Sequence, residues 1–295
     1  MKTYFVLILC VLFWSGNFIL ARFMKDSIEP LELAFLRWFF VFLFISPYLF
    51  IHRKKLFTYI KAYFVSLLIL SILSVSAFNT LLYYGLQTTT ATNALIINSV
   101  TPIMVIIFAY FILKQDITKR QSIGIFLSLF GVIYLILEGS IQTALALEFN
   151  EGDIWIIISS LTWALYSVVL KFKPGEIQGF DFFAILVVLG LLILFPLYLS
   201  QGYTLESQII LIENNFMIFI YVSIFASILS YYFWNHGIEK IGASKTSQFT
   251  HLMPLFGSFL AYIFLDESLQ YFHIVGMALI FLGIYLSLFQ KERKL

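Results

Sequence analysis

Long apolar blocks alternate with short polar segments along the whole chain of 295 residues. The blocks are roughly 18–23 residues long, which is the length an α-helix needs to cross about 30 Å of hydrocarbon. They predict ten membrane spans, at 4–23, 31–51, 64–86, 91–113, 120–138, 153–172, 180–199, 216–237, 243–265 and 270–289. We therefore expect an all-α membrane protein whose termini lie on the same side.

The composition agrees with this pattern. Hydrophobic residues make up 61% of the chain and charged residues 12%, whereas a soluble domain has about 45–50% and about 25%. The first apolar block runs on to Ala21 without a small-x-small cleavage site, so we expect a retained helix rather than a signal peptide. The net charge of +2 is small and forms no basic groove, so no nucleic-acid partner is expected. The single cysteine, Cys10, allows no disulfide within the chain.

Lysine and arginine are distributed unevenly between the two sides. Of the 18 basic residues, 15 fall on the side of the termini: Lys2, Arg53, Lys54, Lys55, Lys61, Lys114, Lys119, Arg120, Lys171, Lys173, Lys240, Lys245, Lys291, Arg293 and Lys294. Cytoplasmic loops retain positive charge, so we expect both termini to be cytoplasmic. The compact loops and the lack of a targeting extension indicate the inner (plasma) membrane of a prokaryote.

The two halves of the chain resemble each other in sequence. A shift of 149 residues places Trp14 on Trp163, and Pro47 on Pro196. After a three-residue change in offset, a shift of 152 places Gly85 on Gly237, Pro102 on Pro254, Gly124 on Gly276 and Gly131 on Gly283. The sequence thus predicts two five-helix repeats, 1–138 and 153–295, joined by an outer loop at 139–152. Because each repeat has an odd number of spans, the second is inverted relative to the first, an arrangement found in many carriers with alternating access.

Four short motifs, in order along the chain, resemble the EamA-type branch of the drug/metabolite transporter superfamily. They are Leu12-Phe13-Trp14-Ser15-Gly16-Asn17, Glu29-Pro30 leading to Leu36-Arg37, Asn98-Ser99-Val100-Thr101-Pro102, and His251-Leu252-Met253-Pro254. The resemblance implies a basket of ten helices around a central cavity, lined mainly by the third, fourth, eighth and ninth, and most often the export of amino acids or related metabolites. The second half departs from the first at Ala164-Leu165-Tyr166 and at Leu186, which stand where the first half has Ser15-Gly16-Asn17 and Arg37.

Two polar clusters precede prolines within predicted spans. Gln248 and His251 lie one helical turn apart before Pro254, and Asn98 and Thr101 hold the corresponding place before Pro102. Each proline frees a backbone carbonyl one turn earlier, which favours a helix kink or hinge beside a polar pocket. We expect both clusters to bind the solute, the alternative for His251 being a hydrogen bond to a neighbouring helix.

Further candidate binding residues lie within predicted spans, where a polar group needs a partner or a cavity. They are Trp14, Asn17, Asn79, Tyr83, Trp163 and Tyr166. The two tryptophans either stack on a flat solute or fill the core with a hydrogen-bonded N–H. Ser223, Ser227 and Ser230 are expected to serve helix packing.

Arg37 is the one basic residue deep inside a predicted span, because the others lie in loops or within three residues of a span end. A salt bridge to an acid at the outer end, reached by snorkelling, is one interpretation, and binding of a solute carboxylate is the other. No acid lies near the middle of a span, and Glu32, Glu138, Asp181, Asp266 and Glu267 are expected at helix ends. The absence of a buried carboxylate relay favours facilitated diffusion or exchange over proton coupling.

These features together predict a transporter of small polar metabolites that acts by alternating access. The alternatives are a flippase for a lipid or lipid-linked sugar and, more remotely, a membrane-embedded enzyme. The four histidines form no metal motif, and no catalytic residues, metal or cofactor are predicted. The expected partners are a small-molecule solute and the lipid bilayer, with the protein a monomer or a homodimer.

Overall fold

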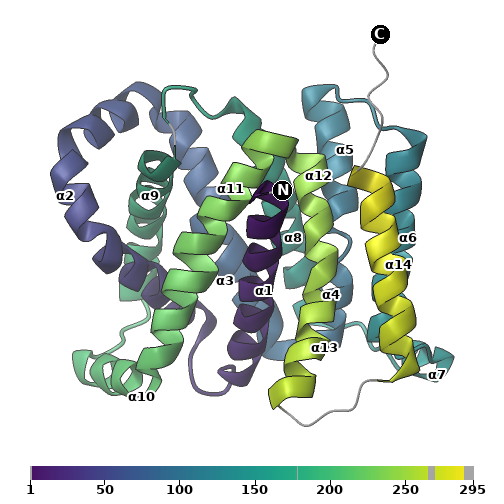
Figure 1. Ribbon diagram of the computed structural model, residues 1–295. Coiled ribbons are helices and arrows are strands. Elements are labelled where there is room, and N and C mark those ends of the chain that lie inside the picture. The colour runs from purple at the N-terminus through teal and green to yellow at the C-terminus, as the bar shows by residue number, and fades with distance from the viewer. Residues whose placement is uncertain (1, 178, 265–269, 289–295) are drawn as a thin grey trace.

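The computed structural model describes residues 2–177, 179–264 and 270–288, and within them all regular structure is helical (Figure 1). The first half contains α1 (Lys2–Phe23), α2 (Pro30–Ser71), η1 (Ile72–Ala77), α3 (Phe78–Thr88), α4 (Ala91–Asn98), α5 (Thr101–Leu113), α6 (Lys119–Ile136) and α7 (Ile141–Leu145). The second contains α8 (Glu151–Val169), η2 (Leu170–Phe172), α9 (Gly179–Leu199), α10 (Leu205–Ser223), η3 (Ile224–Leu229), α11 (Ser230–Ile241), α12 (Ala243–Thr246), η4 (Ser247–Leu252), α13 (Met253–Phe264) and α14 (Tyr271–Leu288).

Eight helical stretches among the described residues are long and apolar enough to cross a membrane. Two of them exceed a single crossing: Pro30–Thr88 has 59 residues and Leu205–Ile241 has 37. The first contains the predicted spans 31–51 and 64–86, and Figure 1 shows it arching over one end of the molecule. The predicted connection at 52–63 is itself helical, because its basic residues end the apolar block without breaking the helix. The helix is kinked at Tyr63, directly before the predicted start of the span 64–86. The total of ten spans stays a prediction.

Other predicted boundaries also change. The predicted span 91–113 is interrupted at Ser99 and Val100, and most of 243–252 is short or 3₁₀ helix before α13 begins at Met253. Pro102 and Pro254 each stand at the start of the segment that follows. The predicted loop 139–152 contains the short helix α7 and the first residues of α8. Asp266 and Glu267 lie outside the described residues.

Irregular backbone occurs at equivalent positions of the two halves. The π-helical segments η1 and η3 begin at Ile72 and Ile224, which are 152 residues apart. The non-helical dihedral angles at Tyr63 (φ −127°, ψ 28°) match those at Asn215 (φ −124°, ψ 19°), again 152 residues apart. The two arches that these kinks terminate, in α2 and α10, lie at opposite ends of the molecule (Figure 1). The sequence repeat thus has a counterpart in the backbone.

Glycines allow the equivalent helices α6 and α14 to touch backbone to backbone. A Cβ atom on Gly124 would lie 2.5 Å from the carbonyl oxygen of Gly283, and one on Gly131 would lie 3.0 Å from that of Gly276. We call residues at equivalent positions of the two halves repeat-mates; Gly276 is the repeat-mate of Gly124, and Gly283 is that of Gly131. Gly124 therefore faces the repeat-mate of Gly131, and Gly131 faces the repeat-mate of Gly124. Close approach at small residues is a common way for membrane helices to associate, and the exchange of partners is what a two-fold relation between the halves produces.

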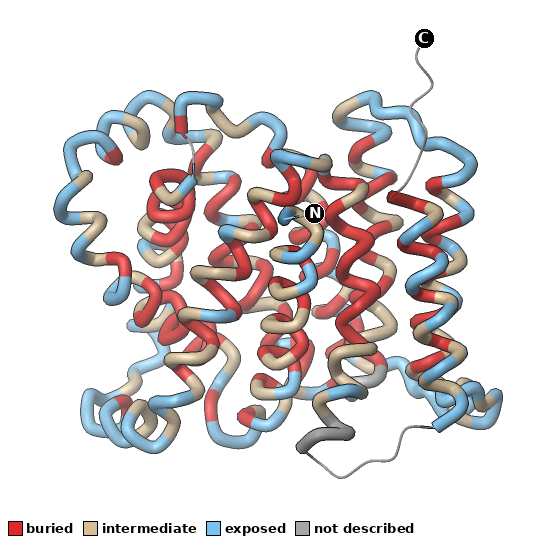
Figure 2. The backbone as a smooth tube through the Cα atoms, viewed as in Figure 1, coloured by how far each residue is buried: buried red, intermediate tan, exposed pale blue. Residues whose placement is uncertain are grey.

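Buried residues concentrate on the central helices, and exposed residues on α7, α10 and the arch of α2 (Figure 2). Many exposed residues along the outer helices are apolar, such as Phe126 on α6 and Phe281 on α14. Such an apolar surface would be unfavourable in water, but it is favourable in contact with the hydrocarbon tails of lipids. The buried interior instead holds a group of polar residues on α1, α2, α3 and η3.

Candidate functional site

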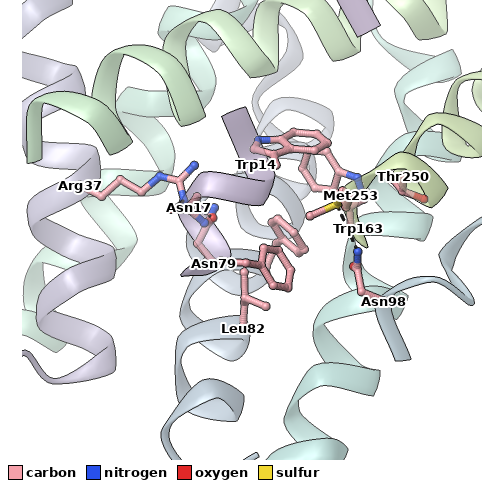
Figure 3. Close-up of a pocket in the computed structure, with 11 residues that line it drawn as sticks. Trp14, Asn17, Arg37, Asn79, Leu82, Asn98, Trp163, Thr250 and Met253 are labelled. Atoms are coloured by element: carbon pink, nitrogen blue, oxygen red, sulfur yellow. Dashed lines mark hydrogen bonds between the residues drawn. The ribbon is translucent and has the colours of Figure 1, made fainter. Parts of the chain in front are cut away.

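A small cavity of about 20 Å³ lies among these central helices (Figure 3). Its lining combines polar and aromatic side chains: Trp14, Asn17, Phe18, Arg37, Phe78, Asn79, Leu82, Asn98, Trp163, Thr250 and Met253. Arg37, Asn79 and Trp163 are at most 2% exposed. These three side chains are therefore almost inaccessible to solvent in this conformation.

Arg37 is the charged group of the cavity, and it is held by neutral acceptors. Its hydrogen bonds run from Nε to Ser227 Oγ (2.6 Å), from Nη1 to Asn79 Oδ1 (2.8 Å), Tyr83 OH (2.8 Å) and Asn17 Oδ1 (3.3 Å), and from Nη2 to the carbonyl of Ala226 (2.8 Å). Figure 3 shows its side chain reaching from α2 toward Asn17 and Asn79. Several good hydrogen bonds lower the cost of burying a cation in a low-dielectric interior.

Of the two interpretations of Arg37, the outward salt bridge is wrong. None of the ion pairs among the described residues includes Arg37, and its guanidinium points inward to acceptors from three other elements, α1, α3 and η3. Ser227, which is expected to serve helix packing, also forms hydrogen bonds: its hydroxyl accepts from Arg37 and donates to the Val222 carbonyl (2.7 Å). Inward hydrogen bonding is available at this depth, so snorkelling is unnecessary.

The π-helical segment η3 supplies an acceptor that an ordinary α-helix would not. In a π-turn the widened backbone leaves a carbonyl without its usual N–H partner. The carbonyl of Ala226 accepts from Trp14 Nε1 (3.0 Å) as well as from Arg37. The equivalent carbonyl in η1, that of Ser74, accepts from Asn79 Nδ2 (3.3 Å) and Tyr231 OH (2.7 Å). Both π segments therefore position polar side chains around the cavity.

Aromatic residues form the opposite part of the cavity. Trp14 and Trp163, which are repeat-mates, meet edge to face with ring centroids 5.1 Å apart. The ring centroids of Phe78 and Trp163 are 4.5 Å apart. The indole of Trp14 is hydrogen-bonded, but Trp163 Nε1 has no partner among the described residues. A buried N–H without a partner is costly, and this one lies in a cavity wall where a solute acceptor would satisfy it.

The interrupted helices contribute a second pair of repeat-mates, Asn98 and Thr250, which both line the cavity. Asn98 lies at the end of α4, and its Nδ2 donates weakly to the Met253 sulfur (3.5 Å). Thr250 lies in η4 just before the proline-led α13. The break before each proline thus turns one polar side chain toward the centre.

Comparison with known proteins agrees with this architecture. The model of the EamA-like transporter family matches residues 1–137 and 150–289. This chain belongs to the EamA-like transporter family. It is 32% identical over 222 residues to the uncharacterized transporter YyaM of Bacillus subtilis, covering 75% of this chain and 72% of that protein. An uncharacterized transporter of Archaeoglobus fulgidus is 26% identical over 294 residues, covering 97% of each chain.

A solved crystal structure has the same fold, with a TM-score of 0.69 and 14% identity over 97% of this chain and 96% of that chain. At this identity the likeness shows the fold alone. As an EamA-like protein of the drug/metabolite transporter superfamily, the chain is a multi-pass membrane transporter.

Some residues predicted to bind the solute of this EamA-like transporter lie away from the cavity. His251 is fully buried, with Nδ1 2.6 Å from Ser128 Oγ and Nε2 2.8 Å from the Ser99 carbonyl. Both ring nitrogens are thus hydrogen-bonded to neighbouring helices. This was the alternative to solute binding in the sequence analysis of His251. Gln248 and Thr101 are also fully buried and are not among the lining residues.

Tyr83 and Tyr166 lie behind the cavity wall rather than in it. Tyr83 OH donates to Asn17 Oδ1 (3.1 Å) and accepts from Arg37. Tyr166 OH donates to Asn235 Oδ1 (2.7 Å). Asn17 is equivalent to Tyr166 and Tyr83 to Asn235, so the same tyrosine–asparagine bond occurs in both halves with the residue types exchanged. These tyrosines position polar neighbours instead of facing a solute.

Sequence reasoning missed several lining residues, namely Phe18, Phe78, Leu82, Thr250 and Met253. Thr250 had a usable signal, because the shift of 152 residues places it on Asn98. Phe18, Phe78 and Leu82 had none, since an apolar residue in a span looks the same whether it faces lipid, a neighbouring helix or a cavity.

No acidic residue lines the cavity in the described part of the chain. The buried acids have other partners: Glu32 Oε1 accepts from Gln208 (2.6 Å), Asp153 bonds to Thr89, and Asp181 pairs with Lys55 (2.7 Å). The described residues also contain no cluster of potential metal ligands. The chemistry available in the cavity is therefore recognition by hydrogen bonding, one positive charge and aromatic surface.

Proposed function

We propose that this transporter carries small polar metabolites, such as amino acids or related compounds, by alternating access at the central cavity. The proposal includes export or facilitated movement through the inner membrane, with both termini cytoplasmic, and involves no catalytic step. The uneven placement of lysine and arginine supports the orientation. The compact loops support the placement in the inner membrane of a prokaryote, and the proposed assembly is a monomer or a homodimer.

One observation carries the mechanism: equivalent residues of the two halves meet at the cavity. Trp14 contacts its mate Trp163, and Asn79 Nδ2 donates to the hydroxyl of its mate Tyr231 (2.9 Å). Contacts between mates occur where a two-fold axis passes, so the cavity lies at the interface of the inverted halves. If the halves exchange conformations, the same cavity opens first to one side and then to the other.

Solute counterflow by purified protein in liposomes tests the proposal, with labelled amino acids, nucleosides and aromatic monocarboxylates as the solutes. We expect saturable counterflow of one class by the wild type, and its loss in Trp163→Ala. Trp155→Ala is the matched control, because Trp155 contacts Tyr84 (ring centroids 6.0 Å apart) and does not line the cavity. Cooperative thermal unfolding of each variant shows that it is folded.

Two results count against the proposal. Equal counterflow by Trp163→Ala and wild type would show that the solute takes another path. An absence of counterflow for every solute, with folded protein, would favour the flippase alternative, for which a fluorescent lipid in the same liposomes is the next substrate.

A further inference from the structure

We propose that the solute carries a single carboxylate, which Arg37 and Trp163 hold, and that its remaining part is apolar or aromatic. This inference rests on the proposed transport function and narrows its substrate class. It follows from three properties of the cavity: an uncompensated positive charge, an excess of hydrogen-bond donors and a largely apolar remaining wall.

The charge of Arg37 has no counter-charge in the described part of the protein. The residue is 1% exposed, its acceptors are all neutral, and the cavity wall contains no acid. Neutral acceptors reduce the desolvation cost of a buried cation, but an anion in contact removes far more of it because attraction is strong in a low dielectric. A negatively charged group in this cavity is therefore favoured over a neutral or positive one.

The hydrogen-bond count points the same way. Nη2 of Arg37 carries two N–H groups but donates only to the carbonyl of Ala226 among the described residues. Trp163 Nε1 donates to nothing, and Asn98 Nδ2 has only the weak acceptor Met253 Sδ. The cavity thus offers donors, while the side-chain oxygens of Asn17 and Asn79 already accept from Arg37. A ligand that supplies acceptors fits this set.

The amount of charge distinguishes a carboxylate from a phosphate. Leu186 occupies the position equivalent to Arg37 in the second half, so the cavity has one cation rather than two. Nη1 is saturated by three acceptors, which leaves Arg37 a single N–H for the ligand and no bidentate fork. A phosphate dianion needs more positive charge and more donors than this. One carboxylate balances the site.

The remaining residues of the cavity wall indicate the chemistry of the rest of the solute. Phe18, Phe78 and Leu82 line the cavity together with the faces of Trp14 and Trp163. No acidic side chain of the described wall is available to pair with a second, cationic group. The fitting ligand is a monocarboxylate with a hydrocarbon or aromatic body.

Binding of matched probes to the purified full-length protein tests the inference without any variant. The probes are 3-phenylpropionate, its neutral isostere 3-phenylpropanamide, and phenyl phosphate, and the readout is the dissociation constant from the shift in Tm. We expect the carboxylate to bind about 10–100-fold more tightly than the amide, as the loss of a charged hydrogen-bond partner implies. We also expect it to bind more tightly than the phosphate. Equal binding of acid and amide, a preference for the amide or phosphate, or no binding of either acid or amide overturns the inference.

Variants of Arg37 test whether this residue causes the preference for the acid over the amide. Arg37→Lys keeps the charge and is expected to keep the preference for the acid, whereas Arg37→Gln is expected to bind acid and amide equally. If Arg37→Gln does not fold, Trp163→Phe serves instead, with a reduced but persistent preference for the acid. An unchanged preference in a folded Arg37→Gln variant overturns the role of Arg37.

Counterflow separates this inference from the proposed function. Saturable counterflow of labelled solutes combined with equal binding of acid and amide would leave transport standing and reject the carboxylate. Selective binding of the acid combined with no counterflow of any solute would do the reverse.

Discussion

At the residue scale, Arg37 and Trp163 are exceptions to the rule that buried polar groups are fully satisfied. One N–H of Arg37 Nη2 has no acceptor, because three of the five acceptors of the guanidinium are bonded to Nη1. The indole N–H of Trp163 has no acceptor among the described residues. Most other polar residues of the interior are bonded in pairs, as Tyr83 is to Asn17 and Tyr166 is to Asn235. Trp38, Thr101 and Gln248 also have buried polar atoms without a partner, but they do not line the cavity. The free donors of Arg37 and Trp163 do line it, where a ligand can complete them.

The N–H group of Trp163 is expected to contribute to solute affinity. Trp163→Phe keeps an aromatic ring and removes the donor, so the KM for counterflow should rise roughly 2–10-fold, the effect of one hydrogen bond. Trp38→Phe is the control: Trp38 is also fully buried with an unpartnered Nε1, but it does not line the cavity. If both variants raise KM equally, the effect comes from packing rather than from contact with the solute.

Arg37 also shows the limit of prediction from sequence at this scale. The sequence correctly marks it as an unusual charge inside a span, but the outward salt bridge, one of its two interpretations, is wrong. Two of its acceptors, Ser227 and the Ala226 carbonyl, lie about 190 positions away along the chain. The Ala226 carbonyl is free to accept from Arg37 only because the backbone there is π-helical. Hydropathy and helical spacing contain no information on either fact.

At the element scale, irregular backbone does much of the positioning. The π segments η1 and η3 expose carbonyls, and the breaks before Pro102 and Pro254 turn Asn98 and Thr250 inward. The sequence shows both prolines, and it also identified Asn98, the polar residue before Pro102, as a candidate. The π segments were not, because their sequences are apolar and serine-containing like those of ordinary membrane helices. Only their recurrence 152 residues apart, seen in the backbone, shows that both halves use them.

The contact between α6 and α14 depends on its glycines. Gly124→Ala would place a Cβ atom 2.5 Å from the Gly283 carbonyl oxygen and 2.6 Å from the Ser287 nitrogen, both backbone atoms that cannot move without separating the helices. We expect a loss of about 1–3 kcal/mol of stability, measured as a lower Tm in detergent. Gly257→Ala is the control, because its Cβ would have nothing within 4 Å. A Tm for Gly124→Ala at or above that of Gly257→Ala would contradict the close packing.

At the scale of the whole molecule, the two halves share a plan but differ in chemistry. Gly85 meets Ile156, and their mates Gly237 and Leu7 meet in the same way. The repeat was predictable from sequence because glycine and proline positions survive in both halves. The unequal chemistry was predictable only as a list of differences, such as Leu186 in the place of Arg37. What the difference does, namely leave one cation in a shared cavity, required the arrangement in space.

The two inverted halves also predict where each connection lies. Figure 1 places the arch of α2 and the link between α5 and α6 at one end, and α7 and α10 at the other. Thr58 and Lys119 are exposed at the first end, Gln142 and Ser207 at the second. With cysteine at one of these positions, a membrane-impermeant maleimide should label Gln142→Cys and Ser207→Cys in intact cells, and Thr58→Cys and Lys119→Cys only after permeabilisation.

The native thiol does not interfere with this experiment, because Cys10 is fully buried and the wild type therefore gives the background. Labelling of all four positions from outside would indicate an impaired membrane rather than a topology, and is checked with a cytoplasmic marker protein. Labelling of Thr58→Cys and Lys119→Cys alone would place the lysine-rich end outside, against the charge bias. Labelling of one residue from each end would mean that the two ends of the molecule do not face opposite sides of the membrane, and an inverted repeat requires that they do.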